Sequence, residues 1–209
     1  MSLRVRTKIC GITRAQDALH AAACGADALG FVFYEKSPRA ISPQDATAII
    51  AQMPPFVSAV GLFVNEAPER IREIAETCGL DLIQLHGDET PQQCLLPRHR
   101  VVKALRVKDA ESLAGAEAFE VSALLLDAWS PAAFGGTGES FNWELARQIA
   151  ARRSVILAGG LTPDNVAEAI RAVSPFAVDV SSGVESAPGI KDPRKVRAFI
   201  ENARRAMES

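Results

Sequence analysis

Long apolar runs are missing from this sequence, and its charges nearly balance. No stretch approaches the ~20 apolar residues that a membrane-spanning helix requires. The formal net charge is -2, which gives no general attraction to nucleic acids or acidic membranes. The basic cluster Lys191, Arg194, Lys195 and Arg197 is interpreted as a solvated helix face. We therefore expect neither a nucleic-acid nor a membrane partner.

Closely spaced cysteines are missing as well. The chain has four, Cys10, Cys24, Cys78 and Cys94, and no two of them have the spacing of a metal-binding pair. No apolar signal segment precedes Arg4, so we expect a reducing, cytoplasmic setting. Disulfides and a structural zinc site are not expected.

The chain does contain a regularly repeated apolar pattern. It has 209 residues, 48% of them hydrophobic and 23% charged, which suits one soluble globular domain over 1–209. Short apolar runs predict strands at 8–10, 28–33, 57–63, 82–85, 101–105, 123–126, 155–158 and 176–180. Helical spacing predicts helices at 15–22, 43–53, 71–78, 109–120, 142–151, 166–173 and 196–203, with a short one opening at Thr90-Pro91.

This alternation predicts a single (β/α)8 barrel. Parallel strands need crossover connections, and eight strand-helix units in one domain favour closure of the sheet. A doubly wound open sheet is the alternative. Typical barrels have ~250 residues, so the connections here must be short and any long loop is informative.

Local signals mark several ends of these elements. Gly25 and Gly79 are placed to stop the helices that precede them, and Ser42 before Pro43 is typical of a helix start. Thr13 with Gln16 is interpreted as a capping box that opens the first helix.

The active site of a barrel is built from the residues directly after each strand. Here the candidates are Cys10, Arg39, His86 and Asp127, together with three glycine-bearing loops. Two of these loops, Gly159-Gly160 and Ser181-Ser182-Gly183, come after strands seven and eight, where barrels commonly hold a phosphate through backbone N–H groups. The third, at 135–138, is interpreted as a flap.

Cys10 ends the first strand, and alternation places Lys8 on the same face. Taken alone, this stretch favours a small cysteine packed in the core, which is the more common fate of a free cysteine. Lys8 could supply a positive field for the thiol, or it could reach solvent at the strand end.

The sequence resembles the phosphoribosylanthranilate isomerase family of tryptophan biosynthesis. The resemblance runs from Lys8 to Ile190. It is carried by KICGI (8–12), SPR (37–39), GLFVN (61–65), QLHG (84–87), LD (126–127), GGTG (135–138), LAGGL (157–161) and DVSSGVE (179–185).

The resemblance implies the Amadori rearrangement of N-(5-phosphoribosyl)anthranilate to 1-(2-carboxyphenylamino)-1-deoxyribulose 5-phosphate, the third step from chorismate. An acid must protonate the furanose oxygen, and a base must remove the C2 proton. The reaction needs no cofactor and no metal. The expected partner is a small phosphosugar substrate, and the expected assembly is a monomer or a homodimer.

The reaction assigns roles to the candidate residues. We expect Asp127 to be the acid, because Leu125 shares its strand face and an apolar barrel interior would raise the pKa of its carboxyl. Cys10 would be the base, although an ordinary thiol with a pKa of ~8.5 is ionised to only a few per cent at neutral pH. The resemblance implies that Arg39 orients the anthranilate end through its guanidinium, and His86 would line the same end.

Substrate contacts are also expected from the glycine and serine residues of the loops: Gly136, Gly138, Gly159, Gly160, Ser181, Ser182 and Gly183. Two rival functions stay open. One is another phosphosugar barrel, such as indole-glycerol-phosphate synthase or the histidine-pathway aminoaldose isomerase. The other is a phosphosugar-binding protein without catalysis, against which the simultaneous presence of Cys10 and Asp127 argues.

Overall fold

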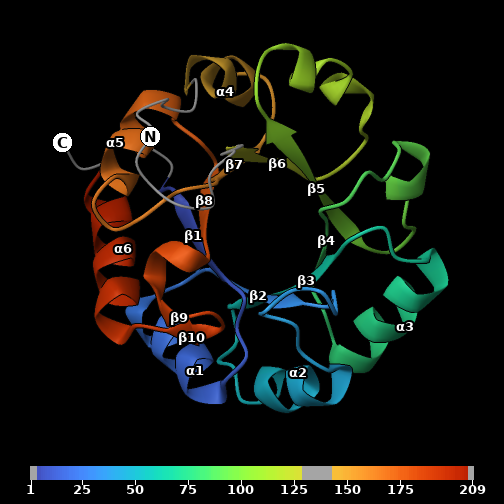
Figure 1. Cartoon of the computed structure of the whole chain (residues 1–209), viewed down its shortest axis with the longest axis vertical. Coiled ribbons are helices and arrows are strands. Elements are labelled where there is room, and N and C mark those ends of the chain that lie inside the picture. Colours follow the sequence, from blue (N-terminus) through green and yellow to red (C-terminus); the bar gives the residue numbers. More distant parts are fainter. Residues whose placement is uncertain (1–3, 129–142, 207–209) are drawn as a thin grey trace.

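The computed structural model describes residues 4–128 and 143–206. Eight parallel strands pair in sequence order, and β8 pairs with β1 to close a barrel. Figure 1 shows this ring of strands with the helices outside it. The strands are β1 (Arg6–Cys10), β2 (Ala28–Val32), β3 (Ser58–Phe63), β4 (Leu82–Leu85), β5 (Arg100–Val107), β6 (Ala123–Ala128), β7 (Val155–Ala158) and β8 (Ala177–Val180). The predicted (β/α)8 barrel is confirmed, and the open sheet is wrong.

Helices cover most of the barrel but not all of it. In the described part of the chain they are α1 (Ala15–Cys24), α2 (Pro43–Ile50), α3 (Pro68–Cys78), α4 (Trp143–Ala150), α5 (Val166–Val173) and α6 (Pro193–Arg205). After β4 and β5 there are only 3-10 turns, η1 (Gln92–Cys94), η2 (Glu111–Leu113) and η3 (Ala116–Ala118). The α-helices predicted after Pro91 and over 109–120 are therefore wrong. Gly115, with φ 84°, interrupts the second of them.

Several predicted helix ends are correct. Gly25 and Gly79 end α1 and α3 in left-handed conformations, and the Ser42 side chain accepts a hydrogen bond from the Asp45 N–H. The predicted capping box is wrong, because α1 begins after Arg14 without a side-chain cap. The Thr13 hydroxyl instead donates to Gly189 O at 2.6 Å, which ties the end of β1 to a distant segment.

Apolar side chains fill two layers. The larger layer lies between the strands and the helices and includes Ile9, Phe31 and Phe199. The smaller one fills the barrel itself and consists of Val102, Ala104, Ala123, Leu125, Ile156, Ala158 and Ala177. Because strand side chains alternate, the residues two positions beyond this inner layer face the mouth of the barrel.

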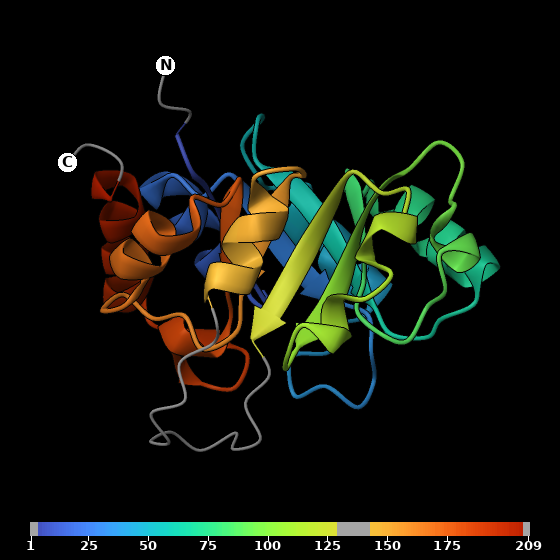
Figure 2. The same ribbon diagram turned by 90° about the horizontal axis from the view of Figure 1, so that it is seen from above.

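A two-stranded ribbon comes after β8, and it was not predicted. It consists of η4 (Ser182–Val184), β9 (Glu185–Ala187) and the antiparallel β10 (Ile190–Lys191). Figure 2, a view from the side, shows this segment and the loop after β2 projecting from the same edge of the barrel. Lys191 is buried against Glu185, so its assignment to a solvated helix face is wrong, whereas Arg194, Lys195 and Arg197 are exposed.

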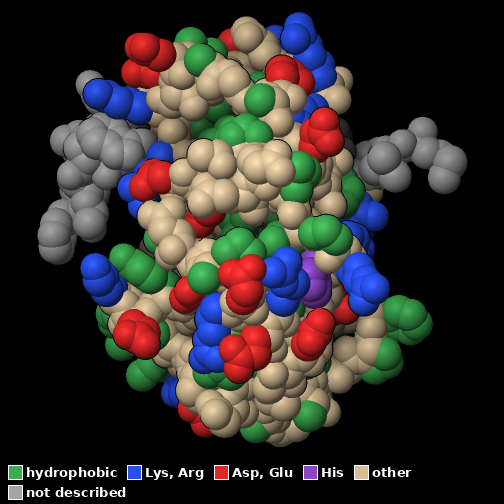
Figure 3. Space-filling view, turned by 90° about the vertical axis from the view of Figure 1, so that its right-hand side faces the viewer, with side chains coloured by type: hydrophobic (Ala, Val, Ile, Leu, Met, Phe, Trp, Pro, Cys, Tyr) green, Lys and Arg blue, Asp and Glu red, His purple; other side chains and the backbone are tan. Residues whose placement is uncertain are grey.

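No helix among the described residues is long and apolar enough to cross a membrane. Acidic and basic side chains intermingle on the face shown in Figure 3.

Candidate active site

A cavity of about 710 Å³ opens where the strands end. Its lining includes every described residue that the sequence predicted for the site: Cys10, Arg39, His86, Asp127, Gly159, Gly160, Ser181, Ser182 and Gly183. Gly136 and Gly138, with the rest of the predicted flap at 135–138, lie outside the described residues. Residues from distant parts of the chain therefore meet in one space of sugar-phosphate size.

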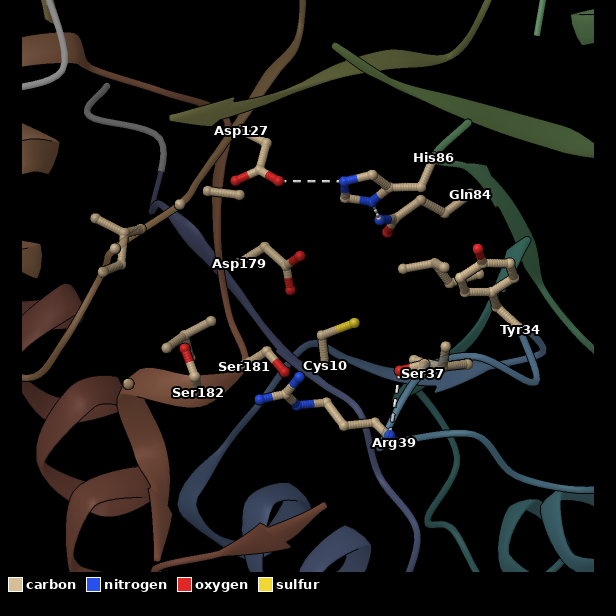
Figure 4. A pocket seen from close by; sticks show the side chains of 18 of the residues that line it. Cys10, Tyr34, Ser37, Arg39, Gln84, His86, Asp127, Asp179, Ser181 and Ser182 are labelled. Carbon is tan, nitrogen blue, oxygen red and sulfur yellow. Dashed lines mark hydrogen bonds and ion pairs between the residues drawn. The ribbon is translucent and has the colours of Figure 1, made fainter. Parts of the chain in front are cut away.

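Cys10 lies at the floor of this cavity, with its sulfur pointing into the space (Figure 4). The residue is 5% exposed. Burial raises the pKa of the Cys10 thiol, and the positive charge of Lys8 opposes this shift without cancelling it. Lys8 does not reach solvent, because its Nζ lies 3.0 Å from Asp179 Oδ1 inside the barrel.

Asp127 lies across the cavity, at the end of β6. Its carboxylate Oδ2 is 3.2 Å from His86 Nε2, and Gln84 Nε2 lies 3.0 Å from His86 Nδ1. If Gln84 donates to Nδ1, a neutral His86 carries its proton on Nε2 and donates it to Asp127. The Asp127 side chain is 30% exposed, so the carboxyl lies at the mouth and not in the apolar interior that holds Leu125. The environment expected for it from strand alternation is thus wrong.

Arg39 is held by a buried acidic residue. Its Nε and Nη2 donate to Glu185 Oε1 and Oε2 at 2.8 and 2.6 Å. Lys191 Nζ donates to the same Oε1 at 2.8 Å and lies 3.3 Å from Ser181 O. Burial alone would raise the pKa of Glu185, but the hydrogen bonds from Arg39 and Lys191 outweigh it and hold that pKa below its ordinary value. One carboxylate therefore joins the arginine to the loop after β8.

The two loops predicted for phosphate are in direct contact. A Cβ on Gly183 would lie 1.9 Å from Leu161 O, so only glycine lets the loop after β8 approach the loop after β7 this closely. The buried Ser181 Oγ has no hydrogen-bond partner among the described residues. Ser181 itself lines the cavity.

Sequence reasoning missed several cavity residues: Gln84, Arg106, Asp179 and, behind Arg39, Glu185. Asp179 lies between Cys10 and the Asp127–His86 pair in Figure 4. Arg106 is exposed and is paired in register with Asp127 on the neighbouring strand. The signal for Asp179 and Arg106 was their position two residues beyond the inward-facing Ala177 and Ala104. The predicted strand 176–180 included Asp179, whereas the predicted strand 101–105 ended before Arg106.

No cluster of three or more His, Cys, Asp or Glu side chains in the described ranges is placed to hold a metal ion. A thiol and a carboxyl on opposite sides of a barrel mouth, with glycine loops after the last two strands, are features of (β/α)8-barrel enzymes that act on small phosphorylated substrates.

Comparison with known proteins identifies the family within this class. A sequence model of the family described as "N-(5'phosphoribosyl)anthranilate (PRA) isomerase" matches residues 7–202. The N-(5'-phosphoribosyl)anthranilate isomerase of Trichlorobacter lovleyi is 59% identical over 97% of this chain and 100% of the relative. That of Geobacter metallireducens is 58% identical over 96% and 99%.

Solved structures agree. The phosphoribosyl anthranilate isomerase of Thermotoga maritima superposes with a TM-score of 0.90 at 48% identity, covering 95% of this chain and 98% of that one. A phosphoribosyl anthranilate isomerase in complex with reduced 1-(o-carboxyphenylamino)-1-deoxyribulose 5-phosphate superposes with a TM-score of 0.87 at 46% identity, over the same shares. The chain belongs to the N-(5'-phosphoribosyl)anthranilate isomerase family, the aldose-ketose isomerases of tryptophan biosynthesis, as its motifs predicted.

Proposed function

We propose that this chain converts N-(5-phosphoribosyl)anthranilate to 1-(2-carboxyphenylamino)-1-deoxyribulose 5-phosphate, with Asp127 as the acid and Cys10 as the base. One observation carries these roles. The thiol and the carboxyl line the same cavity from β1 and β6, on different sides of the space that a sugar would occupy. The reaction is an isomerisation, so acid and base suffice for it.

The acid acts first. Asp127 gives its proton to the furanose oxygen, the bond from that oxygen to C1 breaks, and the nitrogen lone pair forms the C1 iminium. The Cys10 thiolate then removes the proton from C2, and the electrons of that bond form the enolamine. The C2 hydroxyl proton leaves as C1 gains a proton, which gives the aminoketose. Atoms and electrons balance without an external oxidant or reductant.

Asp127 must carry a proton to act as the acid. The hydrogen bond to His86 holds the carboxyl in one orientation. His86 is accordingly assigned to positioning and substrate contact.

The remaining residues bind the two ends of the substrate. The loops at Gly159-Gly160 and Ser181-Ser182-Gly183 suit the phosphate, and the Ser181 hydroxyl has no other described partner. Arg39 suits the anthranilate carboxylate. Because Glu185 occupies its Nε and one Nη2 hydrogen, the free edge of the guanidinium is the one that includes Nη1.

The setting and the assembly belong to the same proposal. The whole chain, 1–209, forms one domain that works in the cytoplasm, which suits four free thiols. It acts as a monomer or a homodimer; a related Thermotoga maritima isomerase is described as dimeric, with monomers generated from it.

Kinetics of matched variants test the roles. Cys10→Ser and Asp127→Asn should each lower kcat by about 10²–10⁴-fold with a smaller change in KM, since general acid-base catalysis contributes about that much. The assay follows the fluorescence of the anthranilate group in substrate made in situ. Cys24→Ser, which changes a thiol on α1 outside the cavity, is the control and should behave like the wild type. Near-normal turnover in either site variant removes that residue from its role.

The phosphate loops have a separate test. A substrate analogue without the phosphate should bind and react much more weakly. If the enzyme processes it as well as the natural substrate, these loops do not hold a phosphate. A protein that binds substrate without turnover would be a binding protein on a barrel scaffold.

A further inference from the structure

Two charged side chains lie inside the barrel next to the proposed base. Register pairs Lys8 of β1 with Asp179 of β8, and both side chains point inward. Their ion pair spans 3.0 Å, with side-chain exposures of 5% and 9%. The inner layer nearby is apolar. A buried pair contributes little to stability compared with apolar packing. Unlike the buried pair of Lys103 and Glu89, this one includes a residue that lines the cavity, Asp179.

Gly30 gives the thiol and the lysine room to meet. It pairs with Cys10 in register, and a Cβ at this position would lie 2.7 Å from Cys10 Sγ and 3.1 Å from Lys8 Cε. Both side chains therefore converge on the space above one glycine. The charges of Lys8 and Cys10 influence each other across this space.

The ammonium also has hydrogen-bonding capacity to spare. Lys8 Nζ and Asp179 Oδ1 are close, but among the described residues neither forms a hydrogen bond of good geometry. An ammonium has three N–H donors, and a thiolate is an acceptor. A thiolate at Cys10 could accept a hydrogen bond from one of these unused N–H donors.

The other charges near Cys10 are weaker influences. Burial raises the pKa of its thiol most, Lys8 lowers it, Asp179 raises it, and Lys191 of β10 lowers it by less than Lys8. A negative charge on Cys10 also contributes to the raised pKa of Arg39, in the loop after β2. Burial by itself would lower the pKa of Lys8, but Asp179 and Cys10 carry it above its ordinary value. Lys8 thus owes its charge at this depth chiefly to Asp179.

We infer that Lys8 and Asp179 are positioning residues for the base: Lys8 is the counter-charge of the Cys10 thiolate, and Asp179 keeps Lys8 charged and in place inside the barrel. The inference rests on the proposed role of Cys10. The negative charge of Asp179 repels the thiolate directly. Its removal should nevertheless destabilise the thiolate overall, because Lys8 without this carboxylate becomes neutral and no longer attracts the sulfur.

The ionisation of Cys10 in the free enzyme tests this inference without turnover. The rate of alkylation by iodoacetamide is measured against pH, and the modified peptide is identified by mass spectrometry. Trypsin cleaves after Lys8 and Arg14, or after Arg6 when Lys8 is replaced, so this peptide contains Cys10 and no other cysteine. Burial raises the pKa of Cys94 to about 11, so that thiol reacts little over most of the range.

Lys8→Met should raise the pKa seen for Cys10 by about one unit or more, which makes alkylation at neutral pH about tenfold slower. Asp179→Asn should shift the pKa in the same direction. The double variant should show no more than the larger single shift, because both changes remove the same charge. In turnover, Lys8→Met should lower kcat more than KM, and raising the pH should restore part of kcat.

Lys103→Met with Glu89→Gln is the matched control. This pair is another buried lysine-carboxylate pair, 2.6 Å apart, and neither residue lines the cavity. This double replacement should leave the pH dependence of Cys10 alkylation unchanged. If Lys8→Met fails to fold because Asp179 is left unpaired, the double variant carries the test, since it removes both charges.

An unchanged or lowered Cys10 pKa in Lys8→Met or in the double variant overturns the role of Lys8. A lowered pKa in Asp179→Asn overturns the role of Asp179. These outcomes are separate from the proposed function: normal turnover of Cys10→Ser would remove the base, whatever the alkylation profile shows.

Discussion

Cys10 and Asp127 occupy very different surroundings. The thiol is almost completely buried and the carboxyl is about one-third exposed, although both line one cavity. A base must lose its proton before it acts, whereas an acid must keep its proton. Burial of Cys10 therefore disfavours the thiolate at neutral pH. The positive charge of Lys8 is important because it favours the thiolate.

The dependence of the rate on pH should consequently include a limb that rises with pH. Because burial raises the pKa of Cys10, the thiolate fraction increases throughout the neutral range and above it. We expect kcat to rise with pH on the acid side of its profile, as the thiolate forms, and to pass through a maximum, because Asp127 must keep the proton that it donates. Steady-state kinetics across a series of buffers measures this. A kcat that falls steadily from pH 6 to pH 8 would speak against a thiolate base.

Single residues could be placed at the cavity from the sequence where one position suffices. Cys10, Arg39, His86 and Asp127 could be found from the sequence because each comes after a strand or ends one, and the cavity contains all four. Asp179 and Glu185 could not, because their importance lies in pairs with Lys8 and Arg39 that are distant in sequence. The exposure of Asp127 was missed because alternation gives the face of a residue but not its depth.

At the scale of elements, the β9–β10 ribbon is the unexpected part. Its strands have three and two residues, which is too short for an alternating pattern to be recognised. The ribbon nevertheless positions Glu185, which accepts from Arg39, Lys191 and the Gly189 N–H. It connects the expected anthranilate side of the cavity to the loop after β8.

Replacement of Glu185 by glutamine should show this connection. The variant leaves Lys191 buried without its counter-ion and frees Arg39, so we expect a loss of about 3–5 kcal/mol in unfolding free energy at pH 7 and a higher KM. The lowered pKa of Glu185 means that its stabilisation is complete above ~4.3 and is lost as the pH falls through the folded-state value.

Urea unfolding at several pH values checks this expectation. The stability gap between the wild type and Glu185→Gln should narrow below about pH 4, within the range in which the wild type still folds. Glu201→Gln, at an exposed pair with Arg205, is the control and should show little change. A gap that stays constant down to about pH 3 would contradict this role of Glu185.

The missing helices of units four and five are the second feature at this scale. The chain replaces them with short turns, which the weak helical pattern after Pro91 and the glycine at 115 partly indicated. The buried pair of Lys103 and Glu89 lies here. Lys103 Nζ donates to Gly87 O at 2.7 Å and to Glu89 Oε2 at 2.6 Å, while Glu89 also accepts from the Asn65 N–H.

Lys103→Met should destabilise the fold by about 3–5 kcal/mol, because it leaves the Glu89 charge buried without a partner. Adding Glu89→Gln should recover a large part of that loss, since a buried pair of neutral side chains carries no unpaired charge. Urea midpoints measure both variants. A double variant no more stable than Lys103→Met would show that the hydrogen bonds of Glu89, and not its charge, are what matters.

At the scale of the whole molecule, the barrel was predictable because its pattern repeats. Each buried parallel strand forms a compact apolar run, and the helices that cover the barrel carry an apolar stripe. Closure into a ring was expected from the number of units, and the order β1 to β8 matches the sequence. The depth of the mouth could not be predicted, because it depends on how the inner layer packs and on the approach of Gly183 to Leu161 O.

This architecture brings residues from β1, β6, β7 and β8 to one edge of the barrel, where they line one cavity. The strand ends and the loops after them therefore supply the proposed site. The flank of the barrel at α3 and the short turns, shown in Figure 3, presents mixed charges.

The most direct test of the proposed reaction is a single turnover with the enzyme in excess over N-(5-phosphoribosyl)anthranilate. The fluorescence of the anthranilate group should decay in the wild type, and the product should have the same mass as the substrate and react as a ketone. Cys10→Ser should bind the substrate but show a decay about 10²-fold slower or more. A wild type that binds the substrate and leaves its fluorescence and structure unchanged would contradict the proposed reaction.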